Sequence, residues 1–405
     1  MLLIAFLSLS INSLFALDIP ADIEDIFTVS TEPRARLLDD AIDASLFEIN
    51  LLKPSTKNIG LRSLVFIDNR PILQDPLNLS KSTFLFSKRE VLNDIEKRVG
   101  DDFQIPDNLY NRVSFWYDIY TQYDSNHIVF HDSDSPWIIY KVVDITPVLS
   151  QPKKHKWTKY HESQKLIVTT RKHISKILIS LSKKKNYKAL NTEEYEIFKK
   201  FSGLRNPRAS IKGAAKRLRS QTGQKNYFQA GLVRSTEHLP KMEQIFISYG
   251  LPPELTRIPL VESSFDVSAY SKVGASGVWQ IMPYIAKQFG ILNKKHDGRS
   301  DIISSTRVAA KLLKEKHSIL KEWPLSITAY NHGPGGIKKA VKLVKSSDLG
   351  KILEKYNSKR FGFASQNFYA CFLASLFAER YQDSIFTNLD PVLVGSIVPS
   401  ETSKN

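Results

Sequence analysis

The sequence predicts an α+β chain whose C-terminal part is mainly α-helical. Its 405 residues, 42% of them hydrophobic and 24% charged, are enough for two or three globular domains. Between residues 18 and 150, short β-branched and aromatic runs bounded by Asn, Asp and Pro are typical of strands. Beyond residue 225, apolar side chains recur three and four positions apart, which is typical of helices.

The first residues are typical of an export signal. Residues 2–16 form an apolar run that ends in Ala16 and is too short to span a bilayer comfortably. We therefore predict a secretory signal over residues 1–16 and a location in the periplasm or cell envelope, with outer-membrane association as one form of it. A basic stretch before the apolar run is missing, and an uncleaved anchor is the alternative. The single cysteine, Cys371, lies in an apolar run and is predicted to be a core residue.

Residues 17–150 are predicted to form an accessory region that is α+β or helical. The runs at 63–67 and 137–143 are β-branched and aromatic, and they predict strands. Between them, the apolar spacing over residues 111–120 predicts a helix.

Two histidines and an aspartate in this region could suggest a metal site. They are His127, His131 and Asp132, but no Cys or further His completes the ligand set. A surface formed by a strand and a turn is the preferred interpretation, and no metal site is predicted.

Residues 151–225 are predicted to be a basic helical segment. They hold 21 Lys and Arg and four Glu, a net +17 against +16 for the whole chain. An apolar stripe indicates a helix with one buried face: Ile174, Ile177, Leu178 and Leu181. Such a charge run attracts polyanions, and for an exported protein these are anionic envelope polymers or a membrane surface. No nucleic acid is expected, because no nucleic-acid motif occurs and aromatic residues are not interleaved as a stacking platform.

Residues 226–390 are predicted to be a helical domain, followed by a C-terminal tail at 391–405. The first helix that we place here ends at Gly250 and has this apolar face: Leu239, Met242, Ile245, Phe246 and Tyr249. Pro252-Pro253 then begins the next helix, in which Pro259 should produce a kink.

Three more helices are predicted from their end signals. Pro283 and Gly290 bracket the first of them. Ser304-Ser305 can cap the second, whose apolar face is Val308, Ala309, Leu312 and Leu313. Pro324 begins the third, and a glycine-rich turn at 333–336 ends it.

A single carboxylate, Glu262, stands where the apolar run after residue 253 ends. A glutamate beside a buried helical face is partly desolvated, which raises its pKa and allows it to hold a proton near neutral pH. That is the requirement for a general acid. Gly274 and Gly277 permit a tight backbone close to a ligand, and the Gln280 amide offers a donor and an acceptor.

The order and spacing of three motifs resemble a known family. Glu262-Ser263, then Gly277-Val278-Trp279-Gln280, then Ala329-Tyr330-Asn331-His332-Gly333 are similar to the catalytic domain of the soluble lytic transglycosylases. Residues 251–255 and 269–275 look especially like the membrane-bound lytic murein transglycosylase D branch. The resemblance covers residues 225–385 and implies a lysozyme-like fold that cleaves the glycan strands of peptidoglycan.

The resemblance also implies roles for individual residues, and it implies no cofactor. Glu262 would protonate the glycosidic oxygen between N-acetylmuramic acid and N-acetylglucosamine. It would then deprotonate the muramoyl 6-hydroxyl, which attacks C1 and leaves a 1,6-anhydro end. Ser263 would orient this glutamate or cap its helix. The other matched positions would bind the sugar or line the cleft: Ser271, Gly277, Gln280, Met282, Tyr330 and Asn331.

Two features leave alternatives open. Most glycosidases use two carboxylates, and the nearby second candidate is Asp266, which is more typical of a turn cap because relatives commonly have Asn there. Where many relatives have Glu-Thr and then Tyr-Val, residues 364–370 read Ala-Ser-Gln-Asn-Phe-Tyr-Ala, so either Phe368 or Tyr369 replaces the expected tyrosine. The chain is predicted to be a lytic transglycosylase. A hydrolytic muramidase of the goose-lysozyme kind and a non-catalytic basic envelope-binding protein are the alternatives.

Overall fold

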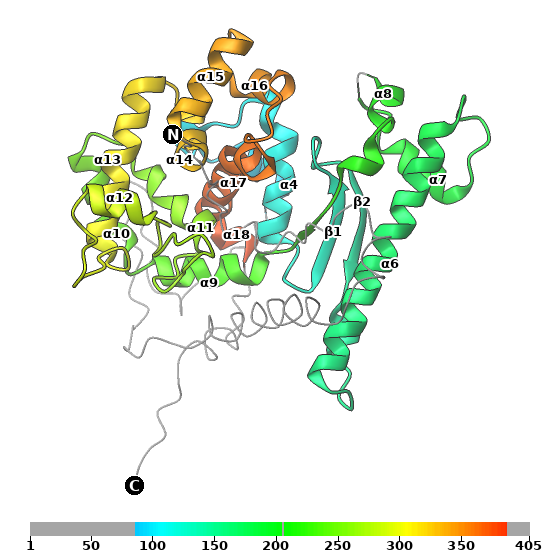
Figure 1. Ribbon diagram of the computed structural model, residues 1–405, viewed down its shortest axis with the longest axis horizontal. Helices are drawn as coiled ribbons and strands as arrows, with labels where there is room; N and C mark the ends of the chain where they lie inside the picture. The colour runs from blue at the N-terminus through cyan, green and yellow to red at the C-terminus, as the bar shows by residue number, and fades with distance from the viewer. Residues whose placement is uncertain (1–85, 205, 387–405) are drawn as a thin grey trace.

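The computed structural model describes residues 86–204 and 206–386 (Figure 1). In this part of the chain a small antiparallel sheet lies between one long helix, α6, and a larger group of helices. The predicted α+β class with a mainly helical C-terminal part is confirmed. The predicted signal at 1–16, the predicted strand at 63–67 and the predicted tail at 391–405 lie outside the described residues.

The three-stranded sheet has the order β2-β1-β3, and both neighbouring pairs run antiparallel. Its strands are β1 (His127–Asp132), β2 (Ile139–Asp144) and β3 (Leu218–Thr222). β2 confirms the strand predicted at 137–143. β3 instead falls inside the segment predicted to be helical, because its polar sequence becomes a strand only through pairing with β1.

The middle strand β1 separates two hydrophobic cores. Val129 belongs to the core of the larger helical group, whereas Ile128 and Phe130 belong to the core under α6. The same strand carries His131 and Asp132, which are 0% and 1% exposed, so the surface position predicted for them is wrong. β1 is therefore covered on both faces, because successive side chains of a strand point to opposite faces and here pack into different cores.

The smaller core lies between the sheet and α6, as Figure 1 shows. It is built by α5 (Thr146–Leu149), α6 (Lys156–Lys183), α7 (Thr192–Lys199), α8 (Pro207–Ile211) and the 3₁₀ helix η5 (Ala214–Arg217). In α6 the predicted stripe is confirmed, because Ile174, Leu178 and Leu181 are buried against this core. The opposite face of α6 is left to solvent.

The larger core surrounds α17 (Phe363–Arg380), which is buried on nearly all sides. α4 (Tyr110–Thr121), the helix predicted at 111–120, packs along α17, and the Trp116 Nε1–H donates to Asn367 Oδ1 at 3.0 Å. Before α4 come α3 (Lys88–Leu92) and the 3₁₀ helices η3 (Asp101–Phe103) and η4 (Asp107–Leu109). Residues of the predicted accessory region therefore help to build this core, and the predicted domain limits stay predictions.

The other helices of this group contribute to the same core, and a long loop separates α11 from α12. None of the helices in the described ranges combines the length and the apolar character that crossing a membrane requires. The helices are α9 (Lys225–Ser235), α10 (Leu239–Ser248), η6 (Pro253–Arg257), α11 (Ile258–Glu262), α12 (Pro283–Gln288), α13 (Ile302–Leu320), α14 (Trp323–His332), α15 (Pro334–Val344), α16 (Leu349–Lys355) and α18 (Gln382–Ile385).

Most predicted helix ends are confirmed, including the end of α14 at Gly333, and the predicted cap of α13 is wrong. Gly250 and Gly290 follow α10 and α12 with φ of +68° and +72°, a conformation that glycine adopts without strain. α13 is capped by Asp301, whose carboxylate accepts from the Ser304 N–H at 2.7 Å, and not by the serines themselves. Gly333 alone separates α14 from α15, because the proline after it already begins α15.

Candidate active site

Glu262 is the last residue of α11, and its residue surface is only 4% exposed. The helix is short because η6 precedes it as a 3₁₀ turn. Pro259 lies in the first turn of α11, where its missing N–H costs no hydrogen bond. The predicted kink therefore takes the form of a change from a 3₁₀ to an α turn. Among the described residues, none donates a hydrogen bond to the Glu262 carboxyl group, and burial raises its pKa to about 8.

A buried cluster of charged side chains fixes the start of α11. The Arg257 guanidinium pairs with Glu243 of α10 and, at 3.0 Å, with Glu379 of α17. All three side chains are at least nine-tenths buried, and Arg257 precedes Glu262 by five residues. The cluster therefore fixes the start of the segment that carries Glu262 against two other helices.

The loop between α11 and α12 folds tightly beside Glu262. Gly277 has a φ of +76°, and a Cβ at this position would lie 2.0 Å from the Arg299 carbonyl oxygen. The Gly277 N–H donates to the Ala269 carbonyl at 2.9 Å. The Ser271 hydroxyl accepts from the Ala275 N–H at 2.8 Å, so this side chain closes a turn inside the loop. Two of the predicted groove residues, Ser271 and Gly277, thus shape the loop backbone.

Replacing Gly277 by alanine is expected to destabilise the protein by more than about 1 kcal/mol, because the new Cβ meets backbone and the φ is strained. Gly335 is the matched control, since it lies in a helix with open space around it and tolerates alanine. Urea unfolding of both variants measures the difference. Equal stability of the two variants would contradict the close approach at Gly277.

Gln280 lies at the turn that ends this loop, with a φ of +46°. Its Nε2 donates to the Gly277 carbonyl at 2.9 Å and to the Ala269 carbonyl at 3.2 Å, which fixes the orientation of the amide. Its Oε1 is buried and accepts no hydrogen bond from the described residues, so it offers an acceptor to a ligand. Met282 is partly exposed and precedes α12 as its N-cap.

Tyr330 and Ser263 each donate a hydrogen bond to the loop between α11 and α12. The Tyr330 hydroxyl donates to the Trp279 carbonyl at 2.8 Å, and the Ser263 hydroxyl donates to the Val278 carbonyl at 3.0 Å. Burial, and then the charge of Glu262, raise the pKa of Tyr330, which places the two side chains within electrostatic reach. Ser263 is the C-cap of α11, and its hydroxyl bonds the loop and not the glutamate side chain. The Trp279 ring is a core group, fully buried and stacked on Phe246.

Two residues of α17, from the stretch at 364–370, contact Tyr330 and Asn331. The Phe368 ring stacks on Tyr330 with centroids 6.4 Å apart, whereas Tyr369 is buried against Phe372 on the core side. Phe368 therefore occupies the side of the helix that faces the site. One turn earlier, the Ser365 hydroxyl donates to Asn331 Oδ1 at 2.8 Å. Sequence reasoning missed Ser365, although its spacing of three from Phe368 places both on one helix face.

The Asp266 carboxylate accepts hydrogen bonds within its own turn. Its Oδ1 accepts from both the N–H and the hydroxyl of Ser268, at 2.8 and 2.7 Å. This is the pattern of a turn-capping aspartate, as the sequence indicated. In the described part of the chain, no group of three or more His, Cys, Asp or Glu residues could hold a metal ion.

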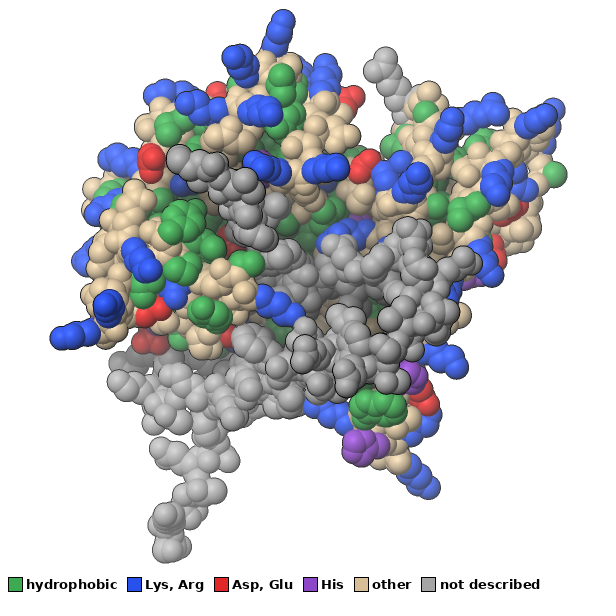
Figure 2. All heavy atoms as spheres, viewed as in Figure 1, with side chains coloured by type: hydrophobic (Ala, Val, Ile, Leu, Met, Phe, Trp, Pro, Cys, Tyr) green, Lys and Arg blue, Asp and Glu red, His purple; other side chains and the backbone are tan. Residues whose placement is uncertain are grey.

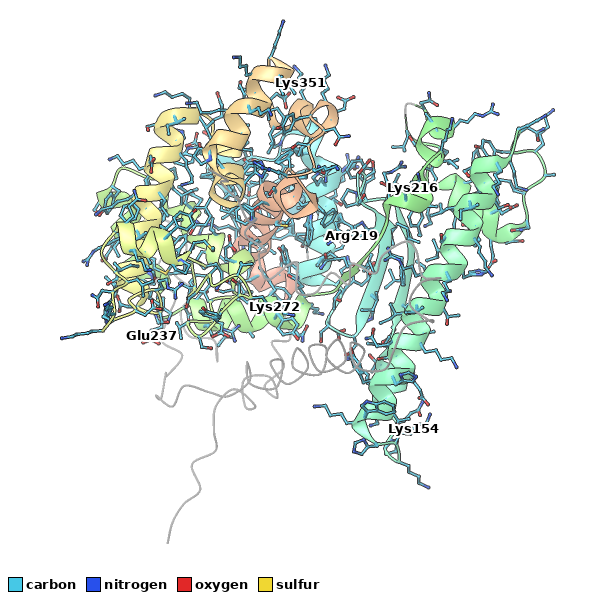
Figure 3. All side chains as sticks on the ribbon, in the orientation of Figure 1. Lys154, Lys216, Arg219, Glu237, Lys272 and Lys351 are labelled. Atoms are coloured by element: carbon cyan, nitrogen blue, oxygen red, sulfur yellow. The ribbon has the colours of Figure 1, made fainter. Side chains whose placement is uncertain are left out.

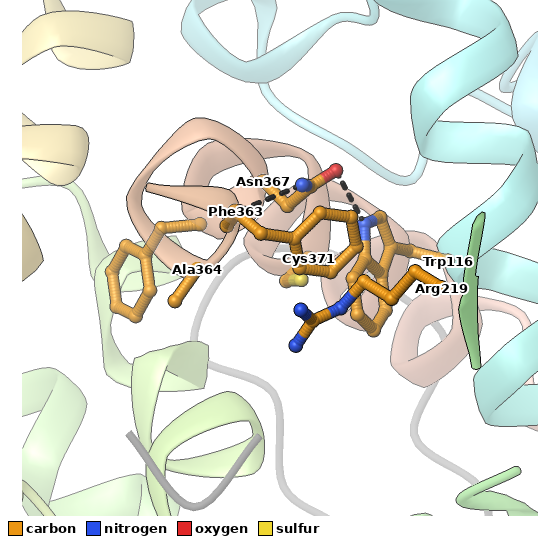
Figure 4. Close-up of a pocket in the computed structure, with 7 residues that line it drawn as sticks. Trp116, Arg219, Phe363, Ala364, Asn367 and Cys371 are labelled. Carbon is orange, nitrogen blue, oxygen red and sulfur yellow. Dashed lines mark hydrogen bonds between the residues drawn. The ribbon is translucent and has the colours of Figure 1, made fainter. Parts of the chain in front are cut away.

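A small pocket lies beside Phe368 (Figure 4). Phe368 belongs to its wall, and so does Cys371, which is buried as predicted. Burial and, more weakly, the charge of Glu262 raise the pKa of the Cys371 thiol. The lining is mostly apolar with one cationic group over the Phe363 ring: Trp116, Arg219, Phe363, Ala364, Asn367, Phe368 and Cys371.

Comparison with known families identifies the class of this domain. Residues 245–352 match the family model described as the transglycosylase SLT domain. The matched segment contains Glu262, the loop with Gln280, and the helix with Tyr330 and Asn331. The family resemblance predicted from the sequence is confirmed, and the chain carries a domain of the SLT family.

The relatives place the domain near one branch of this family. A protein of Alteromonas sp. (strain M-1), named for tributyltin chloride resistance, is 42% identical over 98 residues, which are 24% of this chain and 47% of that protein. The membrane-bound lytic murein transglycosylase D of Escherichia coli (strain K12) is 36% identical over 98 residues, or 24% of this chain and 22% of that protein. The match therefore spans less than half the length of these relatives.

Proposed function

We propose that this protein is a lytic transglycosylase that cleaves the glycan strands of peptidoglycan, with Glu262 as its acid and base. The observation that carries the proposal is a carboxylic acid buried at a helix end, with no donor to its carboxyl among the described residues and a pKa raised to about 8. A group with that pKa is mostly protonated at neutral pH and can give its proton to a leaving oxygen. The SLT-domain match and the likeness to a lytic murein transglycosylase D support the substrate class.

In the proposed reaction Glu262 protonates the glycosidic oxygen between N-acetylmuramic acid and N-acetylglucosamine. The bond from that oxygen to C1 breaks, and the N-acetyl carbonyl of the same sugar stabilises the positive charge at C1. The glutamate, now a carboxylate, takes the proton of the muramoyl 6-hydroxyl, and this oxygen forms the new bond to C1. A hydroxyl held beside C1 competes with water because it is intramolecular.

The surrounding groups fit the binding of an N-acetylated sugar. Gln280 Oε1 can accept from an amide N–H or a hydroxyl of the substrate, and no described residue occupies it. Tyr330 and Phe368 form an aromatic wall beside Glu262, and Ser365 holds Asn331 next to that wall. We assign Gln280, Tyr330 and Asn331 to the cleft. Ser263, Ser271, Gly277 and Met282 are assigned to the positions that shape it.

The alternatives fit the site less well. A hydrolytic muramidase with two carboxylates would need a second acid near Glu262, and the candidate Asp266 already caps a turn. A binding protein that only attracts the envelope through its basic segment would have no need of a desolvated acid. For location, we propose export to the periplasm or cell envelope, where segment 151–225 attracts an anionic surface.

The pH dependence of activity tests the role of Glu262. Because the acid must be protonated and its pKa is about 8, kcat/KM for solubilising peptidoglycan should fall about tenfold per pH unit above that value. Asp266→Asn is the control and should keep both the activity and this alkaline limb, because an amide oxygen can still accept from Ser268. Activity that keeps rising well above pH 8 would contradict the assignment of the acid.

A further inference from the structure

The α6 tip is an exposed basic and aromatic cluster far from the candidate active site. We define it as Lys153, Lys154, His155, Lys156, Trp157 and His161, all of which are exposed. Figure 2 shows hydrophobic and His side chains together with Lys at the lower end of α6, where Figure 3 labels Lys154. The catalytic reaction proposed above makes no use of this cluster, which lies in the basic segment 151–225.

Trp157 is unusual for its exposure. It is 52% exposed, whereas Trp116, Trp279 and Trp323 are between 0% and 9% exposed. The indole stacks on the imidazole of His161, with ring centroids 5.4 Å apart and an angle of 5° between the planes. One face of the indole is therefore covered, and the outer face and the edge remain open. Indole rings in this state are typical of the interface between lipid head groups and acyl chains.

The charge around Trp157 is strongly positive. Between residues 151 and 185 there are eleven Lys and Arg and a single acid, Glu162, which pairs with Lys154 at 2.6 Å. α6 holds 28 residues, about 42 Å of helix, and its buried stripe packs on the smaller core. The opposite face carries Lys165, Lys172 and Lys176 together with the exposed Leu166 and Ile179. Lysines beside exposed apolar groups fit an anionic bilayer surface.

From this charge and this exposed indole we propose that the α6 tip docks the protein on a membrane that contains anionic phospholipids, with Trp157 entering the head-group layer. A neutral polysaccharide is the poorer fit, because it offers no anionic groups to the lysines around Trp157. The inference deepens the envelope location proposed above and does not depend on catalysis by Glu262.

The test uses full-length Glu262→Gln protein, which also allows peptidoglycan to be offered as a competitor without digestion. Vesicles of phosphatidylglycerol mixed with phosphatidylcholine are compared with vesicles of phosphatidylcholine alone by co-sedimentation at low and high salt. We expect salt-sensitive binding to the anionic vesicles and a blue shift of tryptophan fluorescence. Changing Lys153, Lys154 and Lys156 together to Gln should weaken binding by about tenfold or more.

Two further variants identify the residue that enters the membrane. Trp157→Phe should remove the blue shift, and Trp157→Ser should weaken binding. Tyr195→Ser is the matched control, because Tyr195 is equally exposed at 52% and lies on α7 away from the tip. Absence of vesicle binding, binding that the tip substitutions leave unchanged, or tip-dependent binding to isolated peptidoglycan in preference to vesicles would overturn the proposal.

Discussion

Replacing Glu262 by Gln is expected to lower the rate of peptidoglycan cleavage by about 10³-fold, while the protein stays folded. The amide has the shape of the protonated acid but no proton to give. It also costs little to bury at this position, because the native carboxyl group receives no hydrogen bond from the described residues. Release of soluble fragments from purified sacculi measures the rate, and urea unfolding measures the stability. Wild-type rates in the variant would remove Glu262 from the reaction.

The difference in folding stability between Glu262→Gln and the wild type is expected to depend on pH. Folding raises the pKa of Glu262 from 4.5 to about 8, so the folded state binds this proton more tightly than the unfolded state. The contribution of the group to stability is therefore complete at low pH and is lost as the pH rises from about 5 to about 8. One pKa unit corresponds to about 1.4 kcal/mol. We expect Glu262→Gln to become more stable than the wild type across this range, and a constant difference would contradict the burial of the acid.

Replacing Arg257 by Met is expected to destabilise the protein by about 3–5 kcal/mol, because it removes the cation that pairs with two buried carboxylates, one of which keeps only the more distant Arg380 at 3.7 Å. These carboxylates belong to Glu243 and Glu379, on α10 and α17. The midpoint of urea unfolding, with the slope held constant, measures the loss. Activity should fall as well, since Arg257 fixes the segment that ends in Glu262.

Two comparisons make this prediction specific. Changing Glu243 to Gln in the Arg257→Met background should restore part of the stability, because the buried Glu243 carboxylate that has lost the Arg257 cation is then neutral. Arg98 also pairs with two carboxylates, of Glu96 and Asp383, but its side chain is 25% exposed. Arg98→Met should cost about 1 kcal/mol or less. A similar loss in both Arg variants would show that burial of the cluster is not what stabilises α11.

The sequence was sufficient to predict the centre of the site, because the residues that position it lie close to it in the chain. Glu262 directly follows an apolar run, and that run is what buries it. Pro324 lies in the first turn of the helix that carries Tyr330, and the glycine at 277 marks the tight loop. In each case the residues that determine the position lie within a few places of it in the chain.

The features that were missed depend on distant partners. β3 is polar and becomes a strand only beside β1, which lies about ninety residues earlier. Trp116 reaches the centre of the larger core through Asn367, which is 251 residues away. Ser365 acquires its role from Asn331 on another helix. The choice of Phe368 over Tyr369 follows from the packing of α17, since both are aromatic and neighbouring.

The proposed reaction is tested by mass spectrometry of the muropeptides that the protein releases from purified sacculi, with Glu262→Gln in parallel. We expect 1,6-anhydro-muramoyl products from the wild type, lighter than hydrated ones by one water, and none from the variant. Hydrated products would contradict this reaction in favour of a hydrolytic muramidase, and absence of products from both proteins would contradict it in favour of a binding protein.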